Sequence, residues 1–296
     1  MPVITPSRRL HLPIVLRELE VLRTRAVTPR MRRITLGGPQ LGAFRANGFD
    51  LPAFTTEGAD DYVKVFLADG PQAGPVLPEQ HDGHLHWPRK PAPTARAYTV
   101  RRFDAEQREL DLDFVLHGHG VAGTWARSAA VGDTLHLAGP KIATLPPRGA
   151  DWWLLAGDDT ALPAISRYLE ETHDVPVHAA ILVENADEEQ PDLPGVTWVH
   201  RKAGTTAAAL LAEAAARIAP RSGTGWMWIA GETDIVRSLR AVASDLGIPR
   251  DLLDASGYWR APSTGRTPLG RVRTLRESAR ESLDLRRREH IGKPAH

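Results

Sequence analysis

Hydrophobic and polar residues alternate along the first half of the chain, in runs separated by turn residues. A period of two is typical of β-strands that bury one face. Several short strands of this kind predict a closed antiparallel β-barrel. We expect a loose arm at residues 1–13, a short helical turn at 41–44, and a long loop at the proline-containing residues 69–95. The alternating runs are residues 17–36, with a turn at Thr28–Pro29, and residues 62–67, 97–103, 109–116 and 133–139.

The pattern changes after a linker at residues 146–149. Short, wholly apolar runs then alternate with segments of helical periodicity, as in a parallel sheet that is covered on both faces. Ligands of such sheets bind beyond the carboxyl ends of the strands. Residues 271–290 have the periodicity of an amphipathic helix, which we expect to dock on this second domain. The expected strands are residues 152–156, 177–183, 196–200 and 226–230, and the expected helices are residues 162–172, 205–218 and 234–246.

Composition narrows the class of protein. The 296 residues include 37 Lys plus Arg and 36 Asp plus Glu, a balance that argues against a nucleic-acid binder. The lack of cysteine excludes disulfides, a thiolate nucleophile and a cysteine-ligated iron–sulfur cluster. No apolar run reaches the ~18 residues of a membrane-spanning helix, and the N-terminus shows no signal-peptide pattern. We therefore expect a cytoplasmic, monomeric two-domain protein without nucleic-acid or membrane partners.

One stretch, residues 96–126, combines the features of a cofactor site. Arg96, Tyr98 and Thr99 lie on an expected strand, where an arginine can bind a phosphate and a tyrosine can stack on a ring. A glycine-rich turn follows the next strand, and a helix is expected to open at Thr124. Free N–H groups at a helix N-terminus bind anions. The stretch suits a large anionic cofactor with a flat ring, although a half-exposed strand face would show the same spacing.

Three further blocks accompany this stretch: residues 154–164 (LLAGDDTALPA), 228–232 (WIAGE) and 255–260 (ASGYWR). In order and spacing the four blocks resemble the siderophore-interacting proteins, FAD-dependent ferric-siderophore reductases of the ferredoxin-reductase-like superfamily. The resemblance spans roughly residues 17–262. It departs from the family at Asp159, where Glu is usual, and at Ala261-Pro262, where Gly usually follows the arginine.

The resemblance implies an FAD-binding barrel at residues 1–148, an NAD(P)H-binding α/β domain at residues 149–262 and a helical extension at residues 263–296. Electrons would pass from NADH or NADPH through the flavin to a ferric siderophore, and ferrous iron would be released in the cytoplasm. No catalytic side chain is then required. The alternatives are a flavin reductase or diaphorase with another acceptor, a siderophore reductase that receives electrons from ferredoxin, and a siderophore-binding protein without turnover.

The resemblance also assigns residues to the FAD. Trp125 either covers the cofactor or fills the barrel core, and both roles stay open. Tyr258 is expected to shield the flavin ring until nicotinamide displaces it. The expected FAD-binding residues are Arg96, Ala97, Tyr98, Thr99, Asp113, Phe114, Val115, His117, Val121, Ala122, Gly123, Thr124, Trp125, Thr160 and Tyr258.

Nucleotide contacts are expected at the turns that follow the apolar strands. Asp158 and Asp159 would oppose a phosphate and are typical of helix capping, so Thr160 is the better direct contact. A carboxylate at Glu184 favours NADH, whereas Arg201 and Lys202 favour NADPH, and the preference stays open. The expected nucleotide-binding residues are Asp158, Asp159, Thr160, Glu184, Arg201, Gly231 and Glu232.

A cationic mouth beside the flavin would attract an anionic ferric chelate. Lys64, Lys141 and Arg260 are the expected substrate contacts because they flank the family blocks. Arg101 is a further candidate of this kind. For all four, ordinary surface charge is the alternative.

Three histidines lie close together in residues 81–86 (HDGHLH). Clustered histidines such as His81, His84 and His86 can bind a metal ion. The nearest carboxylate in this segment is Asp82, however, and a solvated loop is the simpler interpretation. We therefore expect no metal site.

Overall fold

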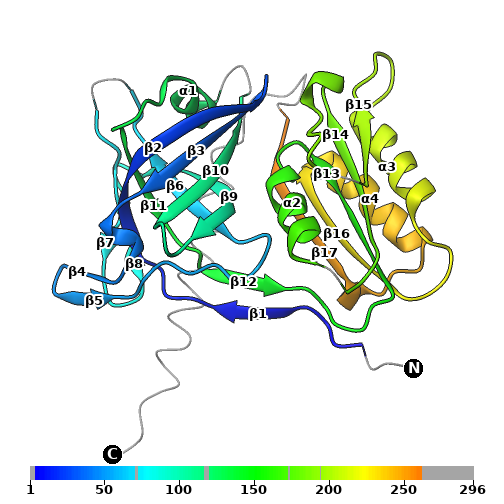
Figure 1. Ribbon diagram of the computed structural model, residues 1–296, viewed down its shortest axis with the longest axis horizontal. Helices are drawn as coiled ribbons and strands as arrows, with labels where there is room; N and C mark the ends of the chain where they lie inside the picture. Colours follow the sequence, from blue (N-terminus) through cyan, green and yellow to red (C-terminus); the bar gives the residue numbers. More distant parts are fainter. Residues whose placement is uncertain (1–3, 71–72, 117–119, 173, 194, 262–296) are drawn as a thin grey trace, which may run out of the picture. The chain divides into compact units, whose positions relative to one another are not determined.

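The computed structural model describes residues 4–70, 73–116, 120–172, 174–193 and 195–261. Six antiparallel strands close into a barrel in the order β10-β3-β2-β11-β6-β9, which confirms the predicted barrel (Figure 1). Their apolar positions alternate into one core, to which β6 contributes Val63, Val65 and Leu67. The six strands are β2 (Leu16–Thr28), β3 (Met31–Gly37), β6 (Tyr62–Leu67), β9 (Thr94–Asp104), β10 (Glu109–Val115) and β11 (Thr134–Ala138).

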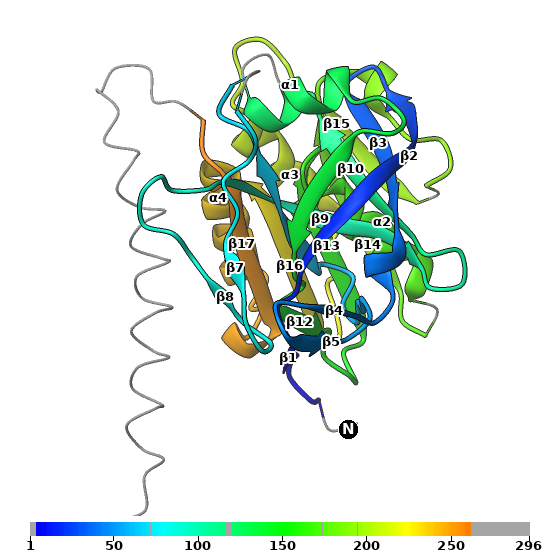
Figure 2. The same cartoon turned by 90° about the vertical axis from the view of Figure 1, so that its left-hand side faces the viewer.

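The two ends of the barrel carry different elements. Helix α1 (Val121–Ser128) lies at one end, and the hairpin of β4 (Phe44–Ala46) and β5 (Phe49–Leu51) lies at the other (Figures 1 and 2). Ala122 and Ala126 of α1 belong to the barrel core. The helix begins at Val121 rather than at the predicted Thr124, because the extended residue Gly120 already serves as its N-cap.

Several short elements escaped the sequence pattern. β1 (Arg8–His11) pairs with β12 (Ile142–Leu145), so the prediction of a loose arm at residues 1–13 was wrong. A strand this short shows little alternation, and its hydrogen bonds come from a partner far away in the sequence. The remaining short elements are the 3-10 turn η1 (Pro39–Leu41), in place of the helical turn predicted at 41–44, and β7 (Glu79–Gln80) and β8 (Leu85–His86) within the loop 69–95.

The second half forms a parallel sheet, as predicted, with five strands in the order β15-β14-β13-β16-β17. One face of the sheet packs with α2 and the opposite face with α3 and α4 (Figure 1). Strand β17 was not predicted, because Asp254, Ser256 and Gly257 interrupt its apolar run. The elements are β13 (Trp152–Asp158), α2 (Leu162–Glu171), β14 (Val177–Val183), η2 (Ala186–Glu188), β15 (Val196–His200), α3 (Ala207–Ile218), β16 (Gly225–Glu232), α4 (Thr233–Asp245), η3 (Arg250–Leu252) and β17 (Leu253–Trp259).

The barrel and the sheet belong to one compact unit that ends at Arg260. A single apolar cluster includes Met31 and Val115 of the barrel together with Leu162 of α2. Polar bonds join the same two parts, as where Thr28 Oγ1 donates to Glu188 Oε2 at 2.5 Å. The junction between barrel and sheet is therefore packed and hydrogen-bonded.

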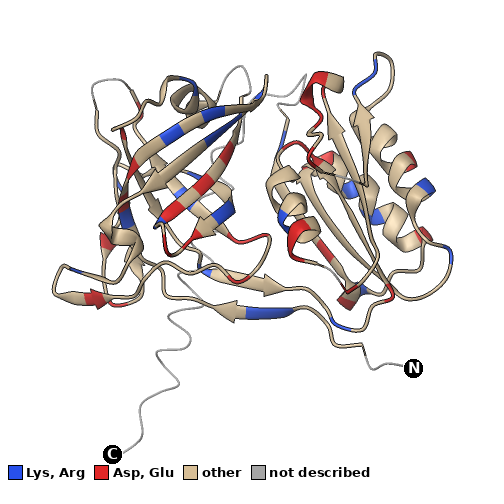
Figure 3. Ribbon diagram, in the orientation of Figure 1, with Lys and Arg blue, Asp and Glu red and all other residues tan. Residues whose placement is uncertain are grey.

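Charges of both signs are interspersed along β2, β3 and β10 (Figure 3). Many of them pair, as Arg23 does with Glu109 at 2.6 Å. Within the described ranges, no helix has the length and apolarity to cross a membrane. The helix predicted at residues 271–290 lies outside the described residues.

Candidate functional site

Strand β9 presents its candidate residues on two opposite faces. Tyr98 packs against the barrel core, whereas Thr99 lies opposite Tyr62, whose side chain is 44% exposed. Because side chains alternate along a strand, Arg96 follows the side of Tyr98 and Ala97 that of Thr99. The expected cofactor residues of β9 are therefore divided between the face toward the barrel core and the outer face.

Tyr98 begins a row of three aromatic rings. Its ring centroid lies 4.2 Å from that of Phe114 on β10, and the Phe114 centroid lies 5.4 Å from that of Trp125 on α1. Phe114 is fully buried, whereas Tyr98 and Trp125 are partly exposed against the core. Burial raises the pKa of Tyr98 to about 12, so its hydroxyl stays protonated and can donate a hydrogen bond. Trp125 thus packs against the core, and part of the aromatic surface stays open to a flat ring.

Strands β9 and β10 part beside these rings. A bulge lies between Asp111 and Leu112, and the pairing of the two strands ends at Leu112 and Val100. Among the described strands, residues 94–99 pair with β6 alone. Their other backbone edge can therefore hydrogen-bond a ligand.

The N-terminus of α1 offers an anion site. The first hydrogen bond of the helix runs from the Thr124 N–H to the carbonyl oxygen of Gly120 at 2.8 Å. The preceding N–H groups of Val121, Ala122 and Gly123 have no partner within the helix, and no side chain of the described residues caps them. These three residues fit the predicted role. The expectation that Thr124 offers its N–H group to a phosphate was wrong, because that group is used inside the helix.

Arg96 adds a cation to the same region of the barrel. Its side chain is exposed, and its Nη1 donates to the carbonyl oxygen of the adjacent Ala95 at 2.9 Å. Within the described part of the chain, no carboxylate forms a salt bridge with it. The guanidinium, the free N–H groups of α1 and the aromatic row fit the FAD that the resemblance implies: they offer donors for its pyrophosphate and a surface for its ring.

Three expected cofactor residues of the next segment have other surroundings. The Asp113 carboxylate is buried and accepts two hydrogen bonds from Arg33, from Nε and Nη2, both at 2.7 Å. Its side chain is thereby held by Arg33, and the cofactor contact of Asp113 stays a prediction. Val115 packs in the apolar cluster between barrel and sheet. His117 lies outside the described residues.

Asp158, at the carboxyl end of β13, is a structural carboxylate. It is fully buried and accepts four hydrogen bonds. Its Oδ1 accepts from the N–H and the hydroxyl of Thr160, and its Oδ2 accepts from the N–H of Glu232 at 2.7 Å and from Nε1 of Trp259 at 2.9 Å. Both oxygens are saturated, so the carboxylate has no free lone pair for a ligand, and the nucleotide contact of Asp158 stays a prediction. The side chain instead ties the ends of three neighbouring strands together.

The next residue, Asp159, differs from Asp158 in its hydrogen bonding. Its Oδ1 is buried without a hydrogen-bond partner. Burial, and secondly the charge of Asp158, raise the pKa of Asp159 to about 7. The positive charge of Arg201 acts in the opposite direction. An orphaned oxygen at this edge of the sheet suits a ligand that donates a hydrogen bond, such as a ribose hydroxyl or a carboxamide.

Glu184 and Arg201, which were expected to favour different nucleotides, form an ion pair. Glu184 Oε2 lies 3.5 Å from Nε of Arg201 and 2.8 Å from Nη1 of Arg30. One carboxylate is thus shared between two arginines, one from the barrel and one from the sheet. The carboxylate is neutralised, and both guanidinium groups are partly exposed.

Gly231 and Glu232 both have structural roles at the end of β16. Gly231 has a φ of +134°, and a Cβ there would lie 2.7 Å from the Asp158 carboxylate. Glu232 caps α4, because its Oε2 accepts from the N–H groups of Asp234 at 2.6 Å and Ile235 at 3.3 Å. The Glu232 carboxylate thus serves as a helix cap, glycine at 231 serves backbone geometry, and the nucleotide contacts of both residues stay predictions.

Tyr258, at the end of β17, reaches the barrel. Its side chain lies beside that of Thr99 on the outer face of β9, and 39% of the residue is exposed. Its ring stands edge-on to Trp228, with centroids 6.5 Å apart. The ring is thus positioned over the face on which Thr99 and Ala97 lie.

Asp60 is a site residue that the sequence analysis missed. Trp228 Nε1 donates to Asp60 Oδ2 at 3.3 Å, which joins the loop before β6 to the sheet. Burial raises the pKa of Asp60 to about 6, and the charges of Asp61 and Asp254 act in the same direction. Two adjacent acidic residues before an apolar strand were the available signal, but their partner Trp228 is far away in the sequence.

The four candidate cations of the substrate mouth differ in their surroundings. Lys64 places its Nζ over the ring of Trp87, 5.1 Å from the centroid, and lies opposite Ala97 in the β6–β9 register. Arg260 is exposed at the end of β17, and Lys141 is partly exposed before β12. Arg101 forms an ion pair with Glu170 of α2, with Nη1 to Oε2 at 2.8 Å, so it is a junction residue rather than part of a substrate mouth.

Fold and site together define the class of protein. A barrel with a helix N-terminus for a pyrophosphate, joined to a parallel sheet whose carboxyl edge can take a nucleotide, is the architecture of a flavin-dependent oxidoreductase. Residues 20–144 match the model of the siderophore-interacting FAD-binding domain, and residues 150–262 match the model of the siderophore-interacting protein. The chain belongs to the siderophore-interacting protein family, and it is an oxidoreductase with an FAD-binding domain.

Named relatives and a solved structure support this assignment. Ferric vibriobactin reductase ViuB of Vibrio cholerae is 32% identical over 254 residues, covering 82% of this chain and 89% of that protein. The NADPH-dependent ferric-chelate reductase of Escherichia coli is 30% identical over 253 residues, covering 83% and 93%. The crystal structure of a siderophore utilization protein from T. fusca is 35% identical, with a TM-score of 0.75 and coverage of 88% and 98%. The predicted family, fold and oxidoreductase class are confirmed.

Proposed function

We propose that the protein uses FAD to reduce ferric siderophores with electrons from NADPH or NADH, and that it releases ferrous iron in the cytoplasm. The observation that carries the proposal is the anion site of α1 and Arg96 beside the exposed part of the Tyr98 aromatic row. The names of the two reductases described above support a ferric chelate as the acceptor. We keep the division into a barrel domain at residues 1–148 and a nucleotide domain at residues 149–262.

The barrel residues hold and orient the cofactor. The N–H groups of Val121, Ala122 and Gly123 and the guanidinium of Arg96 neutralise the pyrophosphate. The protonated hydroxyl of Tyr98 and the backbone edge of residues 94–99 offer hydrogen bonds to the ring system. When bound, FAD accepts two electrons from a nicotinamide and passes them on singly to ferric ions.

Tyr258 controls access to the face that Thr99 presents. Its ring covers this face and keeps water away while no nucleotide is bound. A nicotinamide reaches the same place only when the Tyr258 side chain moves aside from Thr99. Because the ring is 39% exposed, this movement disturbs little of the packed core.

The arginine pair at the carboxyl edge of the sheet favours NADPH. A carboxylate discriminates against a 2′-phosphate by repulsion, but Glu184 is neutralised by Arg30 and Arg201. Both guanidinium groups are partly exposed, so each keeps donors that can bind the phosphate. The NADPH dependence in the name of the Escherichia coli relative agrees with this assignment.

Lys64, Lys141 and Arg260 are the substrate contacts in this proposal. Their charges attract anionic ferric chelates, and the Trp87 ring beneath the Lys64 ammonium adds a flat apolar surface. One NADPH reduces two ferric chelates, with release of NADP⁺ and one proton. Ferrous iron is held less tightly by hard oxygen ligands, so it leaves the chelate after reduction.

Anaerobic stopped-flow spectroscopy tests the proposal on the purified full-length protein. We expect a flavin spectrum that bleaches with NADPH and, more slowly, with NADH. Addition of a ferric hydroxamate or catecholate should restore the spectrum while a ferrous-specific chelator reports two ferrous ions for each NADPH.

The possible outcomes separate the proposal from its alternatives. A colourless protein that does not bind added FAD would overturn it. If only reduced ferredoxin bleaches the flavin, ferredoxin and not a nicotinamide nucleotide is the electron donor. If the reduced flavin reacts with quinones but not with ferric chelates, the electron acceptor is not a ferric siderophore.

A further inference from the structure

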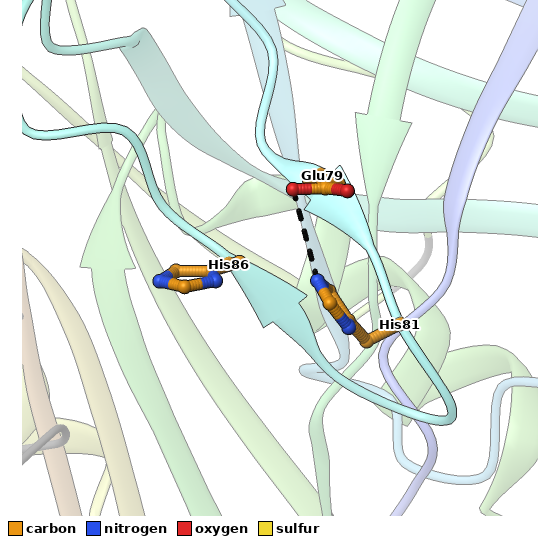
Figure 4. A group of neighbouring side chains, drawn as sticks. All are labelled: Glu79, His81 and His86. Carbon is orange, nitrogen blue, oxygen red and sulfur yellow. Dashed lines mark ion pairs between the residues drawn. The ribbon is translucent and has the colours of Figure 1, made fainter. Parts of the chain in front are cut away.

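The β7–β8 hairpin brings together three side chains that can ligate a metal ion. Glu79 and His86 are directly opposite each other in its register, and His81 follows β7 at the turn. Figure 4 shows the three side chains on the two arms of the hairpin. The carboxylate is thus supplied by Glu79, which the sequence analysis did not consider, rather than by Asp82.

The ligand atoms already lie close to one another. One ligand atom from each of Glu79, His81 and His86 lies within 4.8 Å of the other two. His81 Nε2 lies 3.8 Å from Glu79 Oε2, which is too far for a hydrogen bond. This nitrogen is shielded from solvent and has no hydrogen-bond partner. A buried polar atom of this kind usually has a partner, such as water or an ion.

We propose that the hairpin binds a divalent first-row transition metal ion through Glu79, His81 and His86. Two imidazoles and one carboxylate are a common ligand set for zinc and for non-haem ferrous iron. With metal–ligand bonds of about 2.0–2.2 Å, neighbouring ligand atoms of a tetrahedral ion are about 3.4 Å apart. From separations within 4.8 Å, the side chains therefore need to close by at most about 1.4 Å, and those of Glu79 and His86 are exposed and free to turn.

The backbone beneath the site is held in place. The buried side chain of Gln80 accepts from the N–H of Leu16 at 2.6 Å and donates to the carbonyl oxygen of His81 at 2.6 Å. Leu85, opposite Gln80, packs in an apolar cluster against the barrel. Two of the three ligands thus flank an anchored residue, which lowers the entropy lost when a metal is bound.

The proposed metal site has too few protein ligands to fill the coordination sphere of the ion. Three protein ligands leave at least one coordination position for water or for an exchangeable ligand. Trp87, which follows His86, lies under the Lys64 ammonium, so the hairpin adjoins a candidate substrate residue. If the proposed function holds, the ferrous iron that it releases belongs to the class of ion that this site binds, but the site itself does not depend on the flavin.

Cobalt(II) is the probe for this site. The full-length protein is stripped with a chelator and titrated with Co²⁺, followed by competition with Zn²⁺. We expect one equivalent of Co²⁺ to give visible absorption bands and Zn²⁺ to displace it. H86A and E79Q should each weaken Co²⁺ binding at least tenfold, and their flavin content and unfolding midpoint report whether they are folded.

Two matched variants serve as controls. His84 stacks on His81 in the same hairpin, with centroids 5.2 Å apart, but is not part of the ligand set. His200 forms a His–carboxylate pair with Glu189 at 2.7 Å, without a third ligand. H84A and H200A should bind Co²⁺ as the wild type does. No saturable binding, or equal losses in H84A and H86A, would overturn the proposal, whatever the flavin assay shows.

Discussion

The guanidinium of Arg167, on α2, donates a hydrogen bond from Nη1 to the carbonyl oxygen of Gly58, in the barrel, at 2.8 Å. The same nitrogen lies 3.2 Å from the carbonyl oxygen of Val100, the residue after Thr99 on β9. One buried arginine therefore joins the sheet domain to the strand that faces Tyr258. The relative position of Thr99 and Tyr258, on which the proposed nicotinamide site depends, rests partly on this side chain.

Replacing Arg167 should loosen the junction. In R167M two barrel carbonyl groups lose their buried donor, and each unsatisfied group costs about 1–3 kcal/mol. We expect the free energy of unfolding in urea to fall by about 2–4 kcal/mol and NADPH-dependent ferric reduction to fall with it. R237A is the control, because Arg237 forms an exposed ion pair with Asp234 on α4. Equal stabilities of R167M and R237A would contradict this role.

Asp60 should make stability depend on pH. Its pKa is about 6 in the folded protein, against 3.8 as the ordinary value, because it is buried. The raised pKa stabilises the fold below about pH 4, and this contribution is lost as the pH rises through about 6. D60N keeps an acceptor for Trp228 but cannot ionise, so it should be more stable than the wild type at pH 8, by up to ~3 kcal/mol, and similar at pH 4.

Urea unfolding of D60N at pH 4 and pH 8 measures this difference. D187N is the control, since Asp187 is exposed on η2. The opposite result would be a wild-type free energy of unfolding that rises relative to that of D60N between pH 4 and pH 8. It would show that the fold stabilises the charged form of Asp60.

The fold was more predictable from the sequence than the site, for a physical reason. The strands Tyr62–Leu67 and Val177–Val183 have the predicted bounds because their hydrophobic pattern is complete within the strand itself. The roles of Asp60 and Glu79, in contrast, depend on partners that the fold supplies, Trp228 across the junction and His86 across a hairpin.

The surroundings of the predicted carboxylates could not be predicted for the same reason. A carboxylate at the end of a strand has the same sequence signal whether it faces a ligand or a set of N–H donors. Asp158 and Glu232 proved to face donors of their own chain. Val121, Ala122 and Gly123 stay predictions that the helix geometry supports, because helix N–H groups need no particular side chain to bind an anion.

Removing the Tyr258 ring should ease nucleotide binding. In Y258A the face at Thr99 is uncovered, so a nicotinamide no longer has to displace a ring. We expect the Kd for NADP⁺ to fall by about tenfold, equivalent to ~1.4 kcal/mol, while FAD stays bound. Y258F, which retains the ring and loses only the hydroxyl, should lie between Y258A and the wild type in a titration followed by the flavin spectrum. Weaker NADP⁺ binding in Y258A would show that Tyr258 is a nucleotide contact and not a cover.

Arg201 should set the preference between the two nucleotides. Loss of a guanidinium that pairs with a 2′-phosphate removes a charge-assisted hydrogen bond of about 1.5–3 kcal/mol. In R201A we therefore expect the KM for NADPH to rise by about 10–100-fold while the KM for NADH changes little. R221A is the control, because Arg221 is exposed and donates to the Ala216 carbonyl oxygen at the end of α3. An equal rise in both KM values would place Arg201 elsewhere than at the 2′-phosphate.

Asp158 and Asp159 are adjacent carboxylates with opposite expected effects. Asp158 accepts four hydrogen bonds, and an amide in D158N can accept only at its single oxygen. Two buried donors then lose their acceptor, so the free energy of unfolding should fall by about 2–4 kcal/mol at any pH at which the wild type is folded.

For Asp159 the substitution by asparagine should have the opposite effect on the free energy of unfolding, because burial disfavours its charged carboxylate. Burial raises its pKa to about 7, so its favourable contribution exists at low pH and is lost as the pH rises through about 7. D159N should therefore be more stable than the wild type at pH 8, by ~1–3 kcal/mol, and little different at pH 4. Urea unfolding of both variants at the two pH values separates the two roles. The opposite result at pH 8 would be an unchanged free energy of unfolding in D158N and a lower one in D159N. In that case Asp159 would be the carboxylate with the full set of hydrogen bonds, and the Asp158 carboxylate would be free to bind the nucleotide.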